Sequence, residues 1–399
     1  MKYLFVHQNF PGQFVHLAEK LAAKKGNQVM ALAMNSNPVP PKVVLHPYRA
    51  LRAQVPETHP LLQDMEAKVL RGEACAARAL QLKREGFEPD VIVAHPGWGE
   101  TLFLKDVFPR AKLVIYCEFY YGVEGRDVGF DPEMGPISFE RQCNLRLKNT
   151  ANLHALDIAD AAISPTQWQK STYPAWAQSK IEVIHDGIRL DRLQPRANAS
   201  IRLGREGAMQ EFRPGAEILT YLARNLEAVR GFHIFMRCLP EILRRRPQAR
   251  VVIVGGDEVS YGARPAPDLS WREHMLREVG PQLDHARVHF VGKVPYGVYL
   301  DLLQVSKVHA YWATPFVLSW SFLETALSGA PLVASDTPPV AEFADELGVR
   351  RVGFFDRAGF VDALCEELDA PAKPRQTQYL ERIDFDRCLQ RQLQLLAQL

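Results

Sequence analysis

Two arginines flank a predicted strand-to-helix turn in the second half of the chain. The apolar run Ile218–Ala223 is predicted to be a buried strand, with Arg224 at its carboxyl end and Arg230 before a helix that begins near Phe232. Guanidinium groups form paired hydrogen bonds with phosphate oxygens, so two of them at such a turn suit a diphosphate. Two surface arginines on a loop are the alternative interpretation, and the features below favour the first.

A second cluster lies between Thr314 and Asp336, where a predicted strand ends and a helix begins near Ser319 or Ser321. Serine is a favoured helix N-cap, and the amides and dipole at such a terminus attract anions. Glu324, about one turn into this helix, can accept hydrogen bonds from the vicinal hydroxyls of a ribose. An ordinary glutamate near a helix N-terminus, favoured by the dipole, explains the same residue equally well.

Polar and aromatic residues also follow the predicted strands of the first half. Gly12 lies between the first strand and a helix, so its amide could face a phosphate or an acceptor. His95 ends the strand Val91–Ala94, where a hydrogen-bonded loop histidine and a catalytic histidine are both compatible with the sequence. Glu118 begins a polar aromatic loop that suits either sugar stacking or loop packing. The candidate acceptor contacts in these segments are Trp98, Glu100, Tyr120 and Tyr121.

Parallel strands would bring these residues to the edges of two sheets. Short apolar runs alternate with helical patterns along the whole chain, which is typical of α/β layers. The predicted strands are residues 3–6, 29–33, 43–46, 91–94, 113–116, 161–164 and 181–184 in the first half. In the second half they are 218–223, 251–254, 288–291, 308–311, 332–334 and 353–355. Doubly wound sheets of this kind bind ligands outside the carboxyl ends of their strands.

This pattern predicts two Rossmann-like, doubly wound α/β domains that face each other across a cleft. The first spans residues 1–195 and the second residues 196–375, and Gln194–Gly215 is expected to be a linker and loop because it lacks a sustained period. The tail has helical periodicity. Residues 376–399 are therefore expected to form a C-terminal helix that packs back toward the first domain.

Composition restricts the class of protein. The chain has 399 residues with an ordinary hydrophobic fraction of 47%, and its net charge of +2 gives no bulk attraction for nucleic acid. None of its six cysteines lies in a Cys-x-x-Cys pair or at zinc spacing, so free thiols in a reducing compartment are expected. No signal-peptide pattern and no 18-residue apolar window is present, which predicts a cytoplasmic protein. A peripheral contact with the inner face of the membrane remains compatible with this composition.

Four segments together resemble one enzyme family. The donor-site motif of the family-four retaining glycosyltransferases, which have the GT-B fold, is similar to Leu323–Asp336 (Leu-Glu-Thr-Ala-Leu-Ser-Gly-Ala-Pro-Leu-Val-Ala-Ser-Asp). The family's Asn-Gly-Val/Ile turn at the domain junction resembles residues 186–188, Asp-Gly-Ile. Arg224 and Arg230 match its Arg…Lys diphosphate pair, and the opening of one bacterial branch resembles His7–Phe14 (His-Gln-Asn-Phe-Pro-Gly-Gln-Phe). The resemblance touches both halves and nearly the whole chain.

The resemblance implies further contacts with a nucleotide-sugar. Gly256 and Asp257 lie in a turn similar to the family's glycine turn beside the nucleotide, and Lys293 and Val294 match its base-side loop. The donor-binding residues expected on this basis are Gly12, Gly256, Asp257, Lys293, Val294, Phe316, Val317, Leu318, Ser319, Ser321 and Glu324. The residues expected to act in catalysis are Arg224, Arg230, Glu324, Glu118 and His95.

Two positions depart from the family pattern. Eight residues before Glu324, where the family usually has a glutamate near the transferred sugar, the chain has Phe316. At the end of the fifth N-domain strand, where the family often has a histidine near the reacting centre, it has Glu118. Sugar contacts must therefore differ from those of the family, although Glu118 can still hydrogen-bond a sugar or an acceptor.

The expected reaction moves a sugar from a nucleoside-diphosphate sugar, held by the second domain, to a hydroxyl of a glycan, lipid-linked or protein acceptor. Retention of configuration is implied by the resemblance alone. No Asp-x-Asp metal motif ends a strand in the first half, so no metal or other cofactor is expected, and arginines and helix amides would neutralise the leaving diphosphate. A sugar-nucleotide epimerase or phosphorylase of related fold, and a non-catalytic nucleotide-sugar-binding module, remain alternatives. The sugar, base, acceptor and oligomeric state stay open.

Overall fold

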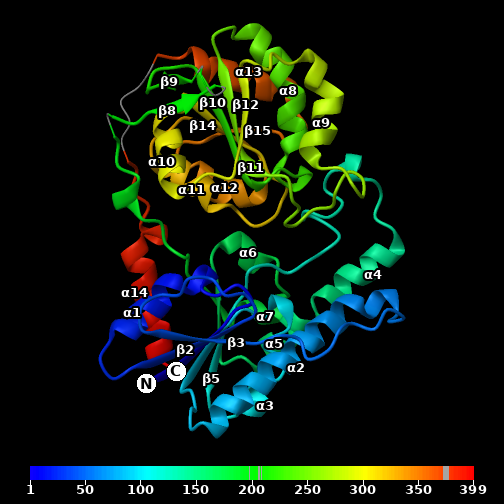
Figure 1. The fold of residues 1–399 in the computed structure, drawn as a ribbon, viewed down its shortest axis with the longest axis vertical. Coiled ribbons are helices and arrows are strands. Elements are labelled where there is room, and N and C mark those ends of the chain that lie inside the picture. The colour runs from blue at the N-terminus through cyan, green and yellow to red at the C-terminus, as the bar shows by residue number, and fades with distance from the viewer. Residues whose placement is uncertain (197, 205–206, 208, 372–376) are drawn as a thin grey trace. The chain divides into compact units, whose positions relative to one another are not determined.

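The computed structural model describes residues 1–196, 198–204, 207, 209–371 and 377–399. The chain divides into two compact units, which Figure 1 shows as ribbons. The N-terminal unit consists of Met1–Gly187 together with Glu381–Leu399, and the C-terminal unit consists of Ile188–Leu380.

The N-terminal unit is built on a seven-stranded parallel sheet. Its strands are β1 (Lys2–Val6), β2 (Gln28–Ala33), β3 (Val43–Pro47), β4 (Val91–Ala94), β5 (Lys112–Tyr116), β6 (Ala161–Ser164) and β7 (Ile181–Val183). They lie in the order β3-β2-β1-β4-β5-β6-β7, so the strand order reverses between β1 and β4. β4 and β6 are buried at every position, which explains why their residues are apolar except for Ser164 of β6.

Helices cover both faces of this sheet (Figure 1). The helices of this unit are α1 (Val15–Ala23), α2 (Gln63–Arg84), α3 (Leu104–Val107), α4 (Phe139–Lys148), α5 (Thr150–Ile158), α6 (Gln167–Ser171), α7 (Ala175–Gln178) and α14 (Phe385–Ala397). One apolar core contains Leu17 and Leu21 of α1 together with Leu396 of α14. A second core contains Leu82 of α2 and Leu156 of α5.

The C-terminal unit has a six-stranded parallel sheet and a two-stranded antiparallel one. The large sheet contains β10 (Ile218–Asn225), β11 (Arg250–Gly256), β12 (Val288–Gly292), β13 (Val308–Tyr311), β14 (Leu332–Ser335) and β15 (Arg350–Val352). Its order is β12-β11-β10-β13-β14-β15, which reverses between β10 and β13. Its helices are α8 (Phe232–Arg245), α9 (Trp271–Val279), α10 (Tyr296–Val305), α11 (Trp320–Leu327), α12 (Pro338–Ala344) and α13 (Arg357–Asp369).

The predicted linker is in fact partly a hairpin. Strands β8 (Ile201–Leu203) and β9 (Gln210–Phe212) pair in antiparallel fashion. Ile201 and Leu203 pack into a core with Val252 and Val254 of β11. Three-residue strands are too short to show a period, which is why the sequence did not reveal them.

The boundaries of the units also differ from the expected ones. The first boundary lies after Gly187 instead of after residue 195, and Arg192 accordingly lies beside Tyr296 of α10, with its guanidinium carbon 5.9 Å from the ring centre. The expected boundary at residue 376 lies outside the described residues. The last predicted strand, 353–355, is wrong by three residues, because β15 is Arg350–Val352.

The C-terminal helix α14 belongs to the N-terminal unit. The ring of Phe385 lies 4.7 Å from that of His16 in α1. Arg391 pairs with Glu182 in β7 at 2.9 Å. The chain therefore enters the C-terminal unit at Ile188 and returns to the N-terminal unit at Glu381.

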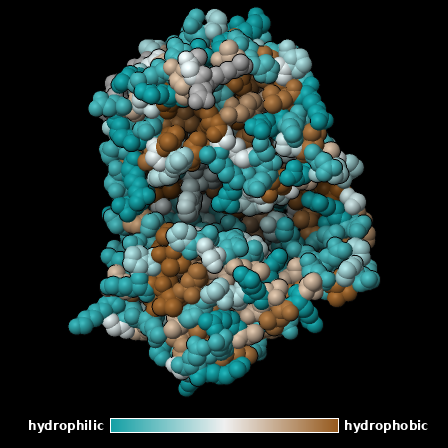
Figure 2. All heavy atoms as spheres, in the orientation of Figure 1, coloured by the Kyte–Doolittle hydropathy of each residue, from teal (hydrophilic) through white to brown (hydrophobic). Residues whose placement is uncertain are grey.

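The surface and the cysteines give two further facts. Polar side chains cover most of the face drawn in Figure 2, with apolar patches between them. Within the described residues, no helix has the length and apolarity needed to span a bilayer.

All six cysteines are free thiols, and each except the half-buried Cys143 is buried.

Candidate functional site

Arg230 lies where the strand order of the C-terminal sheet reverses. It ends the short turn between β10 and α8, and its carbonyl accepts a hydrogen bond of 2.6 Å from the hydroxyl of Tyr221. Its guanidinium donates to the carbonyl oxygen of Val317 at 3.0 Å. Val317 belongs to the loop that leads from β13 into α11. The structure thus brings Arg230 together with the predicted anion-binding loop.

Arg224 is placed differently. It is exposed near the end of β10, beside a register shift between Leu222 and Asn225. Among the described residues it has no hydrogen-bond or ion-pair partner. The structure therefore fixes the position of Arg230 but leaves the side chain of Arg224 in solvent.

The helix α11 begins at an N-cap serine, as the sequence predicted. The hydroxyl of Ser319 accepts from the backbone N–H of Ser321 at 3.3 Å, and the N–H of Ser319 donates to the hydroxyl of Tyr311 at 3.0 Å. The neighbouring Leu318 is buried. These contacts anchor the loop on β13 and fix where α11 starts.

Glu324 is half-buried on α11, where a tyrosine hydroxyl orients its carboxylate. Tyr296, the first residue of α10, donates to Glu324 Oε1 at 2.7 Å. Burial raises the pKa of Glu324, and the hydrogen bonds from Tyr296 and Tyr299 oppose that rise. The guanidinium carbon of Arg192 lies 5.9 Å from the centre of the Tyr296 ring. The carboxylate is thus held in one orientation and can accept further hydrogen bonds.

Phe316 is covered by its neighbours. It is only 3% exposed, and its ring centre lies 4.9 Å from that of Tyr261 and 5.9 Å from the guanidinium carbon of Arg230. Tyr261, at 39% exposure, is the more accessible ring of the pair. Sequence reasoning missed Tyr261, because it lies in the predicted loop between β11 and α9 and no local pattern marks it.

The other predicted donor residues lie at the carboxyl ends of β11 and β12. A Cβ on Gly256 would lie 2.6 Å from both Asn225 Oδ1 and Lys293 Cε, so a larger residue there would displace these side chains. Lys293 is exposed and pairs with Glu258 at 3.1 Å. Asp257 pairs with Arg272 at 2.7 Å. Val294 packs against the core that contains β8.

A second polar cluster occupies the carboxyl edge of the N-terminal sheet. His95 Nε2 lies 3.3 Å from Glu118 Oε2, and the side-chain amide of Gln13 donates to Glu118 Oε1 at 3.3 Å. The oxygen of the same amide lies 3.0 Å from His7 Nε2. A Cβ on Gly12 would lie 2.7 Å from the His7 ring, so the glycine leaves room for this arrangement. The sequence predicted His95, Glu118 and Gly12 as site residues, but not His7 or Gln13.

The hydrogen bonds in this cluster determine where the protons lie. His7 Nδ1 accepts from the backbone N–H of Asn9 at 3.0 Å, so neutral His7 carries its proton on Nε2 and donates to Gln13. His95 Nδ1 accepts from the N–H of Gly97 at 3.2 Å, so neutral His95 also carries its proton on Nε2, which lies 3.3 Å from Glu118 Oε2. Burial, aided by neighbouring His95, lowers the pKa of His7 to about 3. The carboxylate of Glu118 therefore accepts a hydrogen bond from Gln13 and has His95 Nε2 close to its other oxygen.

The four tentative acceptor residues divide into two groups. Trp98 is half-buried and stacks on His95 with ring centres 4.3 Å apart, which places it in the Glu118 cluster. Glu100 is fully buried and accepts from the hydroxyl of Tyr48 at 2.7 Å. The structure therefore does not support Glu100 as an acceptor contact, because its carboxylate lies inside the core and accepts a hydrogen bond there.

The two tyrosines lie in the loop after β5. Tyr120 is half-buried and packs against Tyr173 with ring centres 5.5 Å apart. The backbone of Tyr121 is held by the side-chain amide of Asn149 through bonds of 2.9 and 2.8 Å. The ammonium of Lys148 lies 4.0 Å from the centre of the Tyr121 ring. Both rings are thus held in place by their own unit.

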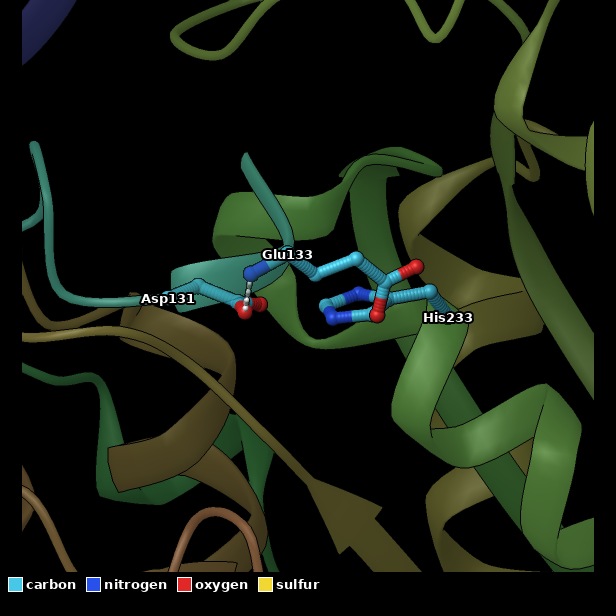
Figure 3. A group of neighbouring side chains, drawn as sticks. All are labelled: Asp131, Glu133 and His233. Atoms are coloured by element: carbon cyan, nitrogen blue, oxygen red, sulfur yellow. Dashed lines mark hydrogen bonds between the residues drawn. The ribbon is translucent and has the colours of Figure 1, made fainter. Parts of the chain in front are cut away.

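Further along the same loop, Asp131 acts as a helix cap. Its carboxylate accepts a hydrogen bond from the backbone N–H of Glu133 at 3.0 Å, drawn as the dashed line in Figure 3. His233, also labelled in Figure 3, is fully buried in the first turn of α8. Its ring lies 5.7 Å from that of Trp271. Neither observation adds a residue to the clusters described above.

Residues 25–193 match the family model described as the glycosyl transferase family 4 group. The chain resembles the family-four glycosyltransferases. A curated relative is spore coat protein SA of Bacillus subtilis (strain 168), with 25% identity over 178 residues. These residues make up 44% of this chain and 45% of the relative, so the match covers less than half of that protein's length.

Solved structures resemble the whole chain. Sucrose-phosphate synthase from Thermosynechococcus elongatus is 15% identical with a TM-score of 0.67, and the match covers 100% of this chain and 98% of that one. An α,α-trehalose-phosphate synthase (UDP-forming) from Burkholderia vietnamiensis is 14% identical with a TM-score of 0.62, over 99% and 96%. A trehalose-6-phosphate protein from E. coli bound with UDP-2-fluoro glucose is 12% identical with a TM-score of 0.59, over 100% and 96%.

These likenesses confirm the predicted fold class. The chain has the GT-B fold, with two Rossmann-like units.

Proposed function

We propose that the chain is a retaining glycosyltransferase that moves a sugar, most simply a hexose, from a nucleoside-diphosphate sugar to a hydroxyl acceptor without a divalent metal. The contact between the guanidinium of Arg230 and the carbonyl of Val317 carries this proposal. It places a permanent cation beside the loop that precedes α11, at the point where the strand order reverses. A leaving diphosphate bound there would meet both the arginine and the positive end of the helix dipole.

The remaining donor contacts follow from the same unit. Glu324, already oriented by Tyr296, would accept hydrogen bonds from the ribose hydroxyls. The narrow turn at Gly256 would let the backbone approach the nucleotide. Lys293 and Val294 would flank the base through backbone groups. Arg224, being exposed, would turn toward the phosphates when the donor binds.

The N-terminal unit would provide the acceptor side of the reaction. Glu118 would accept a hydrogen bond from the acceptor hydroxyl, in an orientation set by Gln13 and His95. The hydroxyl oxygen would form the new bond to the anomeric carbon while the bond from that carbon to the diphosphate breaks. For retention, attack occurs on the face from which the diphosphate departs, so the proton can pass to the leaving phosphate oxygen.

The neighbours suggest which donor to test first. One neighbouring enzyme is described as UDP-forming and another structure contains UDP-2-fluoro glucose. UDP-glucose is therefore the first probe, followed by GDP- and ADP-glucose. A glycan, a lipid-linked glycan and a protein hydroxyl remain the three acceptor classes.

The deciding experiment incubates the full chain with each nucleotide-sugar in EDTA, with and without a mixture of simple sugar acceptors. Release of nucleoside diphosphate that increases with acceptor supports the proposal, and the proton NMR coupling of the product's anomeric hydrogen tests retention. Activity that disappears in EDTA and returns with magnesium or manganese would contradict the metal-independent mechanism.

The same assay separates the alternatives. A sugar-nucleotide epimerase would yield a new nucleotide-sugar and no glycoside. A non-catalytic binding protein, suggested by the replacement of family residues by Phe316 and Glu118, would bind the donor and leave it intact. Neither result is expected if the Arg230 and Glu118 clusters act as described.

A further inference from the structure

The buried carboxylate of Glu227 holds the loop between β11 and α9 through hydrogen bonds. Glu227 is only 1% exposed, and its two oxygens accept from three consecutive backbone N–H groups. These donors are Ser260 at 3.2 Å, Tyr261 at 3.2 Å and Gly262 at 2.9 Å. Hydrogen bonds to an ionised acceptor are stronger than neutral ones, so this set holds the turn in one conformation.

A side-chain hydrogen bond also holds this loop. The side-chain amide of Asn225, at the end of β10, donates to the hydroxyl of Ser260 at 2.7 Å. A Cβ on Gly262 would lie 3.3 Å from Glu227 Oε2, so the glycine permits the close approach of the carboxylate. Asn225 and Glu227, which make these hydrogen bonds, belong to the segment that also carries Arg230. The turn and Arg230 are therefore positioned together.

The hydrogen bonds of Glu227 and Asn225 to residues 260–262 determine where Tyr261 lies. Its ring centre is 4.9 Å from that of Phe316 and 5.6 Å from the guanidinium carbon of Arg230. Phe316, at 3% exposure, is hidden, whereas Tyr261 is 39% exposed. Beside Arg230, the more accessible of these two rings is therefore that of Tyr261, which comes from another loop than Phe316.

We propose that Tyr261 is the residue that selects the donor sugar, and that Glu227 is a positioning residue that presents it. This inference rests on the proposed function, because it assumes a nucleotide-sugar with its diphosphate at Arg230. An aromatic ring packs against the C–H face of a pyranose and offers one hydroxyl, whereas a carboxylate only accepts hydrogen bonds. The ring favours sugars with a continuous apolar face, and the bare nucleoside diphosphate does not need it.

Binding of UDP and UDP-glucose to the full chain tests the role of Tyr261. Tyr261→Ala should weaken UDP-glucose binding about tenfold and change UDP binding by less than about twofold. Tyr261→Phe should retain most of the UDP-glucose affinity because the ring remains. Tyr379→Ala, which removes an exposed tyrosine elsewhere in the same unit, should leave both affinities unchanged.

Hydrogen exchange of the ligand-free protein separately tests the hydrogen bonds between Glu227 and the amides of residues 260–262. In Glu227→Gln the amide nitrogen cannot accept a hydrogen bond, so the amides of residues 260–262 should exchange faster than in wild type. Tyr261→Ala should leave their protection in place, because it keeps the carboxylate. Glu227→Gln should also reproduce the selective loss of UDP-glucose affinity. If Glu227→Gln does not fold, the Tyr261 variants still decide the assignment.

The outcomes separate this inference from the proposed function. If wild type binds UDP but Tyr261→Ala weakens UDP and UDP-glucose by the same factor, Tyr261 does not select the sugar and the proposed function stands. Unchanged exchange in Glu227→Gln overturns the role of Glu227. If wild type binds none of UDP, GDP and ADP, the proposed function fails, and the assignment of Tyr261 fails with it.

Discussion

The side-chain amide of Gln13 donates a hydrogen bond of 3.3 Å to Glu118, 105 residues further along the chain. Its oxygen faces the Nε2 proton of His7, so the amide cannot rotate without losing both contacts. His95 Nε2 lies 3.3 Å from the other carboxylate oxygen, so each oxygen of Glu118 has a polar neighbour. Such preorganisation is what a group that orients a reacting hydroxyl requires.

We expect Glu118→Gln to slow transfer to the acceptor while leaving donor affinity unchanged. The amide can no longer offer two equivalent acceptor oxygens, and the loss of one charge-assisted hydrogen bond corresponds to about 1.5–3 kcal/mol, or roughly 10- to 100-fold. Gln13→Leu should show the same pattern more weakly, because Glu118 remains but loses its hydrogen bond from Gln13. The measurement is steady-state transfer together with UDP titration. Glu124→Gln, an exposed glutamate in the following loop, is the control, and an equal effect there would remove Glu118 from the site.

We expect Arg230 and Arg224 to differ in their tolerance of lysine. Arg230→Lys keeps the charge but loses the planar group that donates to Val317 and that would also bind a phosphate, so UDP binding should weaken about 10- to 100-fold. Arg224→Lys should weaken it by less than about threefold, because the exposed Arg224 has no protein partner among the described residues to lose. Titration of each variant with UDP decides this, and equal losses would mean that the bond to Val317 has no part in donor binding.

The sheets were largely predictable from the sequence, and the reason lies in burial. Strands such as β4 and β13 are buried at every position, and their residues are apolar except for His309 of β13. The edge strand β15 is not an apolar run. Its residues Arg350 and Arg351 form ion pairs with Glu366 and Asp336 at the surface. No periodicity marks a three-residue strand of this kind.

The site was predictable only where a motif is continuous in sequence. The N-cap at Ser319 follows directly from local residue types. Gln13 and Glu227 act on partners 105 and about 35 residues away, through tertiary contacts that local patterns do not encode. The burial of Phe316 has the same origin, because the ring that covers it comes from the loop between β11 and α9.

We expect Phe316 to behave as a packing residue. Phe316→Ala should lower the free energy of unfolding of the C-terminal unit by about 3–5 kcal/mol, because it leaves a cavity between Tyr261 and Arg230. Phe316→Leu should cost much less, since it fills most of the space. Denaturant unfolding followed by tryptophan fluorescence provides the measurement. If Phe316→Ala keeps its stability but changes the preference among nucleotide-sugars, the ring contacts the sugar directly.

The stability of the protein should fall as the pH decreases from about 6.5 toward 3. Burial lowers the pKa of His7, His185 and His309 to about 3 in the folded chain, whereas in the unfolded chain each has its ordinary value of 6.5. Between these values the unfolded state binds a proton that the folded state does not, so acid favours unfolding. The stabilisation from keeping each histidine neutral is fully present above pH 6.5 and is lost by about 1.4 kcal/mol per pH unit per residue within the window.

The role of one histidine in this acid sensitivity can be tested at His309. Its Nδ1 lies 2.7 Å from the hydroxyl of Thr220, and His309→Gln can replace that contact without a group that titrates in this range. We expect the variant to be less stable than wild type at pH 8 but to lose stability less steeply between pH 6.5 and 4. Denaturant midpoints at half-unit pH intervals measure both slopes. Parallel curves for the two proteins would show that His309 is not a source of the acid sensitivity.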